Sequence, residues 1–527
     1  MIKLSQVKTK RLLMVHGWSG MVLGLLLYVV IVTGAVAVMA SEIGRWAVGG
    51  AASAFPMTTG VQERLDALAS TVEPQYLDEI SIFGNSAGHL VYFFHTHGAN
   101  GAGEPDDIGR MLEFDPATGD LLRDRSGFGE DLFGADPESA LDAFLVDLHV
   151  NLHIPNPWGV YITGILGFIM LLAAGTGLLA HRHVLKDLFV PPRYSSALLH
   201  KRDRHILAGS WALPFAFVLA FTGAFYSFAI ALGFPVVTKS AFGGDRMAMV
   251  SALVGAVEEA DATPQAGVNL DALLQISEQR AGAPPLSAII SHFGRADSKV
   301  TVYHAPRAGH LAAQSFIFDG VTGAFEQDKP VVGLRPSASS VGYTLMSRLH
   351  FGNFAGLLSK FVWVSLGFAM AYVTLSGMRL WIERRADSPL WQGFGTVLSV
   401  VGYGLPLALI GSAWGFFLSL SSQTSQLWTP ASFLIACTLI ISAGICGRST
   451  QRLKERFVLA LGIALIATPI LRFLTVGGGW GIESGFDHIV VMMDLLMLIT
   501  GLACVKSALQ MEFLSGIGSA DETVPAE

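Results

Sequence analysis

The chain has 527 residues, of which 52% are hydrophobic and 14% are charged. Soluble proteins carry about 25% charged residues, so this composition excludes an ordinary soluble protein. The net charge of -7 says little, because the two signs occupy different parts of the chain. The three cysteines lack CxxC or CxxCH spacing, which argues against covalently attached haem and cysteine-ligated metal centres.

Eight apolar runs approach or exceed the length of about 18 residues that marks a membrane-spanning helix. The first follows four basic residues, but it is too long for a signal peptide and is interpreted as a helix. The predicted spans are roughly 13–39, 157–180, 206–233, 356–381, 394–420, 429–447, 456–476 and 487–507.

The loops between spans alternate in charge. The amino terminus, HRHVLKDLFVPPRYSSALLHKRDR, ERRADS and GRSTQRLKER are basic, whereas SSQTSQLWTP is uncharged and VGGGWGIESGFDH carries only acids. Basic loops stay in the cytoplasm. We therefore expect both termini in the cytoplasm and two long loops outside it.

Those two loops form a repeat. HLVYFFHTH and MLEFDPATGDLL in the first correspond to KVTVYHA and SFIFDGVTGAF in the second. In each Asp-x-x-Thr-Gly turn, Asp caps the turn and Gly supplies positive φ. The whole unit of span, outer domain and span occurs twice. The expected segments are 1–40, 41–155, 156–181, 182–205, 206–234, 235–355, 356–386, 387–510 and an acidic tail, 511–527.

Four histidines lie at predicted helix ends, and the topology sorts them into two pairs. His16 and His205 open spans one and three at the cytoplasmic face, whereas His149 and His350 precede spans two and four at the outer face. An imidazole pair between helices is a standard arrangement for b-type haem, and nearby glycines leave room for a flat macrocycle. A single histidine at a membrane interface is more often an anchor, and two competing ligands are His153 and His200.

Haem propionates need cationic partners. The candidates near the inner pair are Arg11 and Arg204, and those near the outer pair are Arg348 and Lys360. Positive-inside bias or snorkelling explains these residues equally well.

The segments VHGWSGMVLGLLLYVVIVTGAV, DLHVNLHIPNPWGVYITGILGF, DRHILAGSWALPFAFVLAFTGAF and LHFGNFAGLLSKFVWVSLGF resemble the helices of the PepSY-associated transmembrane family. The resemblance covers roughly 10–386, and the turns Asp115–Gly119 and Asp319–Gly323 resemble PepSY domains. Members of the family are similar to iron-regulated membrane proteins and di-haem ferric-siderophore reductases. One departure is Gly17 after His16, where the family motif has His-Arg.

The resemblance implies a polytopic helical membrane protein of the bacterial inner membrane, with two small α+β PepSY-like domains in the periplasm. It implies ligand roles in two b haems for His16, His205, His149 and His350. The expected activity is electron transfer from the cytoplasm or from quinol to a ferric siderophore or ferric chelate, an oxidoreductase function in iron assimilation. No nucleic-acid partner is expected.

Two further groups attract attention. Arg472 and Asp494 are intramembrane charges at similar depth in the last four helices, and they predict either a structural ion pair or a proton or quinol site. His95 and His97 face the same side of a predicted strand and are candidate metal ligands, although such residues are more often solvated.

The sequence has no GxGxxG motif at a strand–helix junction in a cytoplasmic segment and no GxxxxGK[ST] motif. The electron donor is therefore expected to be a separate reductase, a free reduced flavin or a quinol. Two competing hypotheses are a membrane-anchored PepSY module that modulates peptidases and a siderophore or metal transporter. The last four helices lack the broken pairs typical of transporters.

Overall fold

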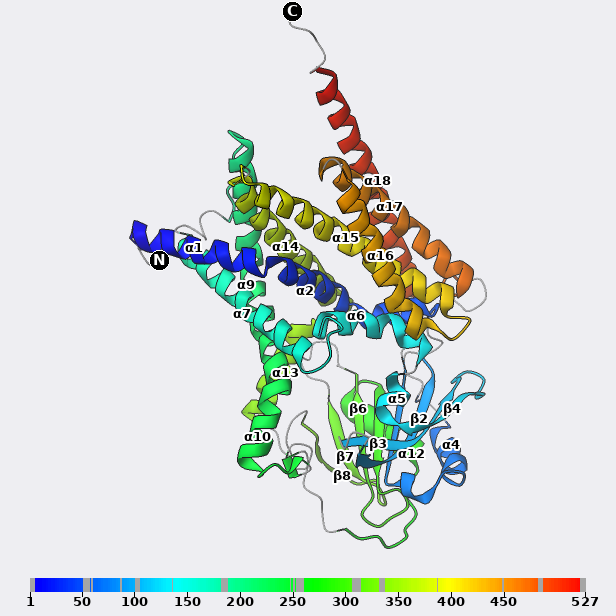
Figure 1. The fold of residues 1–527 in the computed structure, drawn as a ribbon. Coiled ribbons are helices and arrows are strands. Elements are labelled where there is room, and N and C mark those ends of the chain that lie inside the picture. The colour runs from blue at the N-terminus through cyan, green and yellow to red at the C-terminus, as the bar shows by residue number, and fades with distance from the viewer. Residues whose placement is uncertain are drawn as a thin grey trace, which may run out of the picture. The chain divides into compact units, whose positions relative to one another are not determined.

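The structure is a computed structural model that describes residues 5–50, 57, 60–85, 88–99, 105–134, 136–181, 188–246, 248–249, 252, 260–305, 314–330, 337–385, 387–447, 450–481 and 487–521. The chain folds into two compact units. The first contains Met1–Gly49, Ala140–Ala231 and Lys360–Glu527, and the second contains Gly50–Ser139 and Leu232–Ser359. Figure 1 labels most of their helices and strands.

Within the described residues, seven helices are long and apolar enough to cross a membrane, and one bent pair gives up to eight. The chain is therefore a polytopic α-helical membrane protein, as predicted. The seven are α7 (Trp158–Ala180), α9 (Ala197–Phe228), α14 (Gly356–Glu383), α15 (Pro389–Ser419), α16 (Ser425–Cys446), α17 (Thr450–Thr475) and α18 (His488–Asp521).

The first predicted span is two helices rather than one. α1 (Gln6–Val22) and α2 (Gly24–Ala37) meet at Leu23 with a bend of 69°. Glycine at the junction weakens the helix and permits close packing, since a Cβ at Gly24 would lie 2.7 Å from Met378 Sδ. His16 consequently lies within α1 rather than at its end.

α9 begins nine residues before the predicted span. Hydropathy marks only the apolar part of a helix, whereas the Ser196 side chain caps α9 by accepting a hydrogen bond from the Leu199 amide at 3.2 Å. The polar turns around Arg202 are therefore helical, and they bring His205 into the third turn of a continuous helix.

Small residues set the helix contacts of the last four spans. α15 packs on α16 and α17, and α17 packs on α18. A Cβ at Gly462 would lie 2.8 Å from the Gly501 carbonyl oxygen, so these two helices are in close backbone contact.

The second unit contains one antiparallel sheet in the order β4-β3-β2-β1-β5-β6-β7-β8. The two repeats join where β1 pairs with β5, for example at Glu79 and Ser291. The strands are β1 (Glu79–Gly84), β2 (Leu90–Ala99), β3 (Pro105–Phe114), β4 (Leu121–Phe128), β5 (Pro285–Ser291), β6 (Lys299–His304), β7 (Ser315–Asp319) and β8 (Phe325–Asp328).

The two predicted loop domains also share one hydrophobic core. Residues of α4 (Val61–Ala69) and α12 (Leu270–Ala281) pack on alternate side chains of strands from both halves, including Ile80 and Val302. Both Asp-x-x-Thr-Gly turns form as predicted. Asp115 accepts hydrogen bonds from two turn amides before Gly119 (φ 79°), and Asp319 does so before Gly323 (φ 72°).

The remaining described helices are short. They are α3 (Ala40–Ala47), α5 (Gly129–Gly134), α6 (Ala140–Val150), α10 (Phe234–Ala241) and α13 (Ala338–Phe351), with 3-10 turns at Pro74–Leu77 and Pro137–Ser139 and a π turn at Ala229–Gly233.

Candidate functional site

His16 and His205 line one cavity of the first unit. The cavity measures about 1040 Å³ and lies among α1, α7, α9 and α14. Cofactor pockets have volumes of roughly 300–1,000 Å³, so the space is large enough for a macrocycle. Most of its lining is apolar, with side chains such as Leu13, Met170 and Leu213.

The spacing of the two rings fits a metal between them. The ring centres of His16 and His205 are 6.4 Å apart, and the ring planes are inclined at 65°. Imidazole nitrogens bind first-row metals at about 2.0–2.1 Å, so two imidazoles on opposite sides of one metal have ring centres roughly 6 Å apart.

Hydrogen bonds determine which nitrogen of each ring carries the proton. His16 Nδ1 lies 2.9 Å from the Ala173 carbonyl oxygen, which can only accept. His205 Nδ1 lies 3.0 Å from Ser376 Oγ, whose hydroxyl donates to the Val373 carbonyl at 3.0 Å. Both Nδ1 atoms therefore carry the proton, and Nε2 keeps the lone pair of a metal ligand.

A glycine lies against each ring. A Cβ at Gly177 would lie 3.3 Å from His16 Cε1, and one at Gly377 would lie 3.0 Å from His205 Cε1. These glycines give the rings the room they need beside the neighbouring helix.

The cavity also has a basic rim, with two buried nitrogens that lack partners among the described residues. Arg202 Nε and Trp381 Nε1 are both buried without a hydrogen bond. An unsatisfied buried donor is costly, and a carboxylate-bearing ligand would satisfy both. The basic residues on the rim are Lys10, Arg202, Arg384 and Arg385.

The arginines expected near the inner pair lie outside the cavity lining. Arg11 and Arg204 do not line the cavity, and the Arg204 guanidinium instead lies over the Tyr372 ring at 5.5 Å. His200 is half-buried, stacks on Tyr194 at 4.6 Å and does not line the cavity. The basic residues that line the cavity are therefore other than Arg11 and Arg204.

His149, like His16, lies against a helix carbonyl and a glycine. It is the penultimate residue of α6, and its Nδ1 lies 3.0 Å from the Val30 carbonyl oxygen. A Cβ at Gly34 would lie 2.6 Å from its Cε1. The competing His153 instead contacts the Phe144 carbonyl through Nε2 at 3.0 Å and stacks on the Phe144 ring.

His350 belongs to the second unit, where it is the penultimate residue of α13. Its pairing with His149 stays a prediction. Arg348 donates to the Asn353 carbonyl at 2.8 Å. Lys360, in the first unit, is buried and lies 2.6 Å from Glu42, so its charge is already neutralised by a carboxylate.

A Thr-Gly or Ser-Gly pair marks each anchored ring, and the sequence reading missed it. The pairs are Thr33–Gly34, Thr176–Gly177 and Ser376–Gly377. In each, the hydroxyl bonds its own helix while the carbonyl four residues before the glycine faces the Nδ1 side of a histidine. Thr222–Gly223 of α9 repeats the motif.

Arg472 and Asp494 form an ion pair that is enclosed within the last helices. Their closest nitrogen–oxygen distance is 2.9 Å, and their side chains are 0% and 3% exposed. The Asp494 carboxylate also accepts from the indole nitrogens of Trp46 and Trp480, each at 2.8 Å. Nearby, Asp487 pairs with Arg45 at 2.6 Å. These bonds satisfy the carboxylate and favour a structural role.

The histidines of the second unit have different environments. His304 is fully buried between Ser277 and the Ala283 carbonyl, which is typical of a structural histidine. His95 and His97 lie beside Asp107, whose hydrogen bond raises the pKa of His97 to about 9. His183 and His310 lie outside the described residues.

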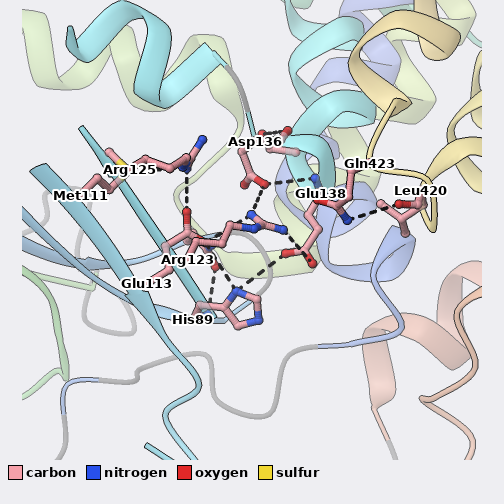
Figure 2. Close-up of polar contacts among 11 residues, drawn as sticks. His89, Met111, Glu113, Arg123, Arg125, Asp136, Glu138, Leu420 and Gln423 are labelled. Atoms are coloured by element: carbon pink, nitrogen blue, oxygen red, sulfur yellow. Dashed lines mark hydrogen bonds and ion pairs between the residues drawn. The ribbon is translucent and has the colours of Figure 1, made fainter. Parts of the chain in front are cut away.

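A network of charged side chains surrounds His89, as Figure 2 shows. Its Nδ1 atom lies 3.9 Å from Glu113 and 3.7 Å from Glu138. Arg123 bonds Glu113 at 3.2 Å and Asp136 at 2.6 Å. Glu113, and then Glu138, raise the pKa of His89 above its ordinary value.

The raised pKa of His89 predicts a pH-dependent contribution to stability. The contribution is fully present below the ordinary pKa of 6.5 and is lost as pH rises through the raised value. Between about pH 6 and pH 8, we expect the thermal stability of the wild type to fall as His89 loses its proton. The fall should be smaller in His89→Gln, which lacks this titrating group. Equal pH profiles for the two proteins, measured at full length in one detergent, would contradict this assignment.

The comparisons with known proteins agree with this architecture. An uncharacterized protein of Pseudomonas aeruginosa is 27% identical over 383 residues, which covers 70% of this chain and 86% of the relative. The sequence model of the protein family described as PepSY-associated TM region matches residues 13–384 of this chain. The match includes all four histidines of the two predicted pairs and ends before α15. The chain therefore belongs to the PepSY-associated transmembrane family.

Proposed function

We propose that this protein carries electrons across the bacterial inner membrane through two b-type haems and reduces a ferric siderophore or related ferric chelate. The observation that carries the proposal is the His16–His205 pair, with ring centres 6.4 Å apart across a cavity with a basic rim. Haem b, when bound, supplies a one-electron Fe(III)/Fe(II) couple.

The side chains around the first site are suited to hold such a group. The Ala173 carbonyl and Ser376 hydroxyl fix the two rings so that Nε2 is the ligand atom. Arg202 and its basic neighbours on the rim would neutralise the propionates. The Trp381 indole nitrogen, buried and without a partner among the described residues, would donate a further hydrogen bond.

The second haem would bind between His149 and His350. The hydrogen bond from His149 Nδ1 to Val30 and the close approach of Gly34 support this role for His149 over His153. The repeat of the helix motif supports His350 as its counterpart, since both residues lie one position before the end of the helix preceding a span.

The charge pattern of the loops supports an orientation with both termini in the cytoplasm and the second unit in the periplasm. Electrons would then enter at the His16 and His205 side from a partner reductase, a reduced flavin or a quinol. By the resemblance to ferric-siderophore reductases, the acceptor outside would be a ferric chelate. Its reduction would weaken the complex, because hard oxygen donors hold Fe(II) less tightly than Fe(III).

Reconstitution into vesicles tests the activity. With reduced flavin enclosed and a ferric chelate and an Fe(II) indicator outside, wild-type protein should produce Fe(II) faster than protein-free vesicles. His205→Ala should lose the protein-dependent rate, and His200→Ala should retain it. Equal rates in the two variants would overturn the proposal for the first pair.

Two neighbouring glycines of α7 provide a matched test of the ring anchor. Valine at Gly177 would press on His16, whereas a Cβ at Gly175 would meet nothing within 4 Å. Both substitutions change helix propensity by less than about 1 kcal/mol. We expect Gly177→Val to lose most of the haem bound at this pair and Gly175→Val to retain it. Equal haem content in the two purified variants would contradict the anchoring role.

A further inference from the structure

Four polar side chains meet on one face of the sheet in the second unit. His95 and His97 lie on β2, and the strand pairing places Glu79 of β1 opposite His95 and Asp107 of β3 opposite His97. Side chains two apart on a strand share a face. Three adjacent strands therefore direct these four groups to one place.

Asp107 faces the Nδ1 atoms of both rings. Its Oδ1 is 2.6 Å from His97 Nδ1, and its Oδ2 is 3.7 Å from His95 Nδ1. One ligand atom from each of His95, His97 and Asp107 lies within 4.8 Å of the others. Bonds of about 2.0–2.2 Å to one metal place its ligand atoms roughly 3–4 Å apart, so a small rotation of the side chains closes this set.

His95 is the buried member of the cluster. It is 3% exposed, and its Nδ1 makes no hydrogen bond among the described residues beyond the 3.7 Å contact with Asp107 Oδ2. The ring is held in place, because it stacks on Phe93 at 4.2 Å and its Nε2 lies 3.3 Å from Ser81 Oγ. A buried nitrogen left unsatisfied beside a carboxylate is costly, and a bound cation would remove that cost.

Glu79 lies at the other edge of the two rings. Its carboxylate oxygens are each 3.7 Å from an Nε2 atom, one in His95 and one in His97. A carboxylate behind a histidine orients the ring and strengthens the opposite nitrogen as a ligand. Asp107 thus lies beside the Nδ1 atoms of the two rings, and Glu79 lies beside their Nε2 atoms on the opposite edge.

We propose that His95, His97 and Asp107 bind a divalent first-row transition metal through the two Nδ1 atoms and a carboxylate oxygen, with Glu79 as the positioning residue. Two histidines and one carboxylate are a ligand set used by Zn²⁺ and by non-haem Fe²⁺. The site lies in the sheet, is separate from the four histidines assigned to haem, and does not depend on the proposed electron transfer.

Titration of full-length, chelator-treated protein with Zn²⁺ alone tests the site by calorimetry. Wild-type protein should bind one Zn²⁺ per chain here, and His95→Gln or Asp107→Asn should weaken this binding by about 100-fold or more. His89→Gln is the matched control, since it replaces a histidine that immediately precedes β2 and lies outside the cluster, and it should bind as the wild type does.

The variant Glu79→Gln separates ligand from positioning residue. It should keep the stoichiometry and weaken binding by about 10–100-fold. Circular dichroism and gel filtration establish that each variant is folded, and a competition titration with Fe²⁺ then ranks the two metals. Absence of Zn²⁺ binding by the wild type, or equal binding by folded His95→Gln and Asp107→Asn, overturns the proposal.

Discussion

Replacement of His205 by alanine is expected to remove about one of two haems per chain and to abolish electron transfer through the first site. The reason is geometric, since His205 is one of two rings 6.4 Å apart whose Nδ1 atoms are hydrogen-bonded to helix groups. Haem content by pyridine haemochrome and visible spectroscopy of the purified variant measures the result.

His200→Ala is the control for this variant. His200 lies five residues earlier on α9, is half-buried, stacks on Tyr194 and does not line the cavity. It should keep the full haem content. A His205→Ala protein with unchanged haem content, or a His200→Ala protein that loses one haem, would contradict the assignment of the first pair.

Replacement of Asp494 by asparagine is expected to destabilise the protein by about 3–5 kcal/mol, because it leaves a buried arginine without its counter-charge. Arg472 is 0% exposed, and its guanidinium is held by Asp494 and by the Gly477 carbonyl. Thermal unfolding in a fixed detergent should show a large drop in midpoint, whereas electron transfer by the remaining folded protein should be unchanged.

Two further variants sharpen this test. Arg472→Met combined with Asp494→Asn removes the unpaired charge and should recover part of the lost stability. Glu383→Gln breaks the exposed pair with Lys201, whose side chain is 54% exposed, and should cost less than about 1 kcal/mol. A folded Asp494→Asn protein with wild-type stability but no electron transfer would instead indicate a functional role for the pair.

The membrane architecture was predictable because hydropathy and loop charge are local properties of the sequence. They located the spans, yet they could not show that the first bends by 69° at Leu23 or that Ser196 begins α9 well before its apolar part. Those features depend on caps and on contacts such as the one between Gly24 and Met378.

The candidate histidines could be chosen from their positions at the ends of apolar runs, which are also a local property of the sequence. The side chains that surround them could not be predicted. Arg202 and Arg204 are two residues apart, which places them on different faces of a helix, and only Arg202 lines the cavity. Which of the two arginines lines the cavity depends on how α9 is rotated about its own axis, and the sequence alone does not give that rotation. The first four spans contain six Thr-Gly or Ser-Gly pairs, and only the structure shows that those ending at Gly34, Gly177 and Gly377 lie against histidine rings.

Considering each repeat separately could not predict that the two repeats of the second unit form one sheet. Strand pairing within a half follows from its hairpins, but the pairing of Ile80 with Ile290 joins segments far apart in the chain. The approach of Asp107 to His95 and His97 likewise depends on strand register. The alternation of side chains along a strand identified His95 and His97 as lying on one face. The third proposed ligand, Asp107, could be identified only from the structure.

Visible absorption of the purified, detergent-solubilised protein, oxidised and then reduced with dithionite, tests the central claim most directly. We predict sharp reduced α and β bands of six-coordinate haem b with about two haems per chain. A folded preparation, made with haem supplied, that contains no haem would contradict the proposed electron transfer.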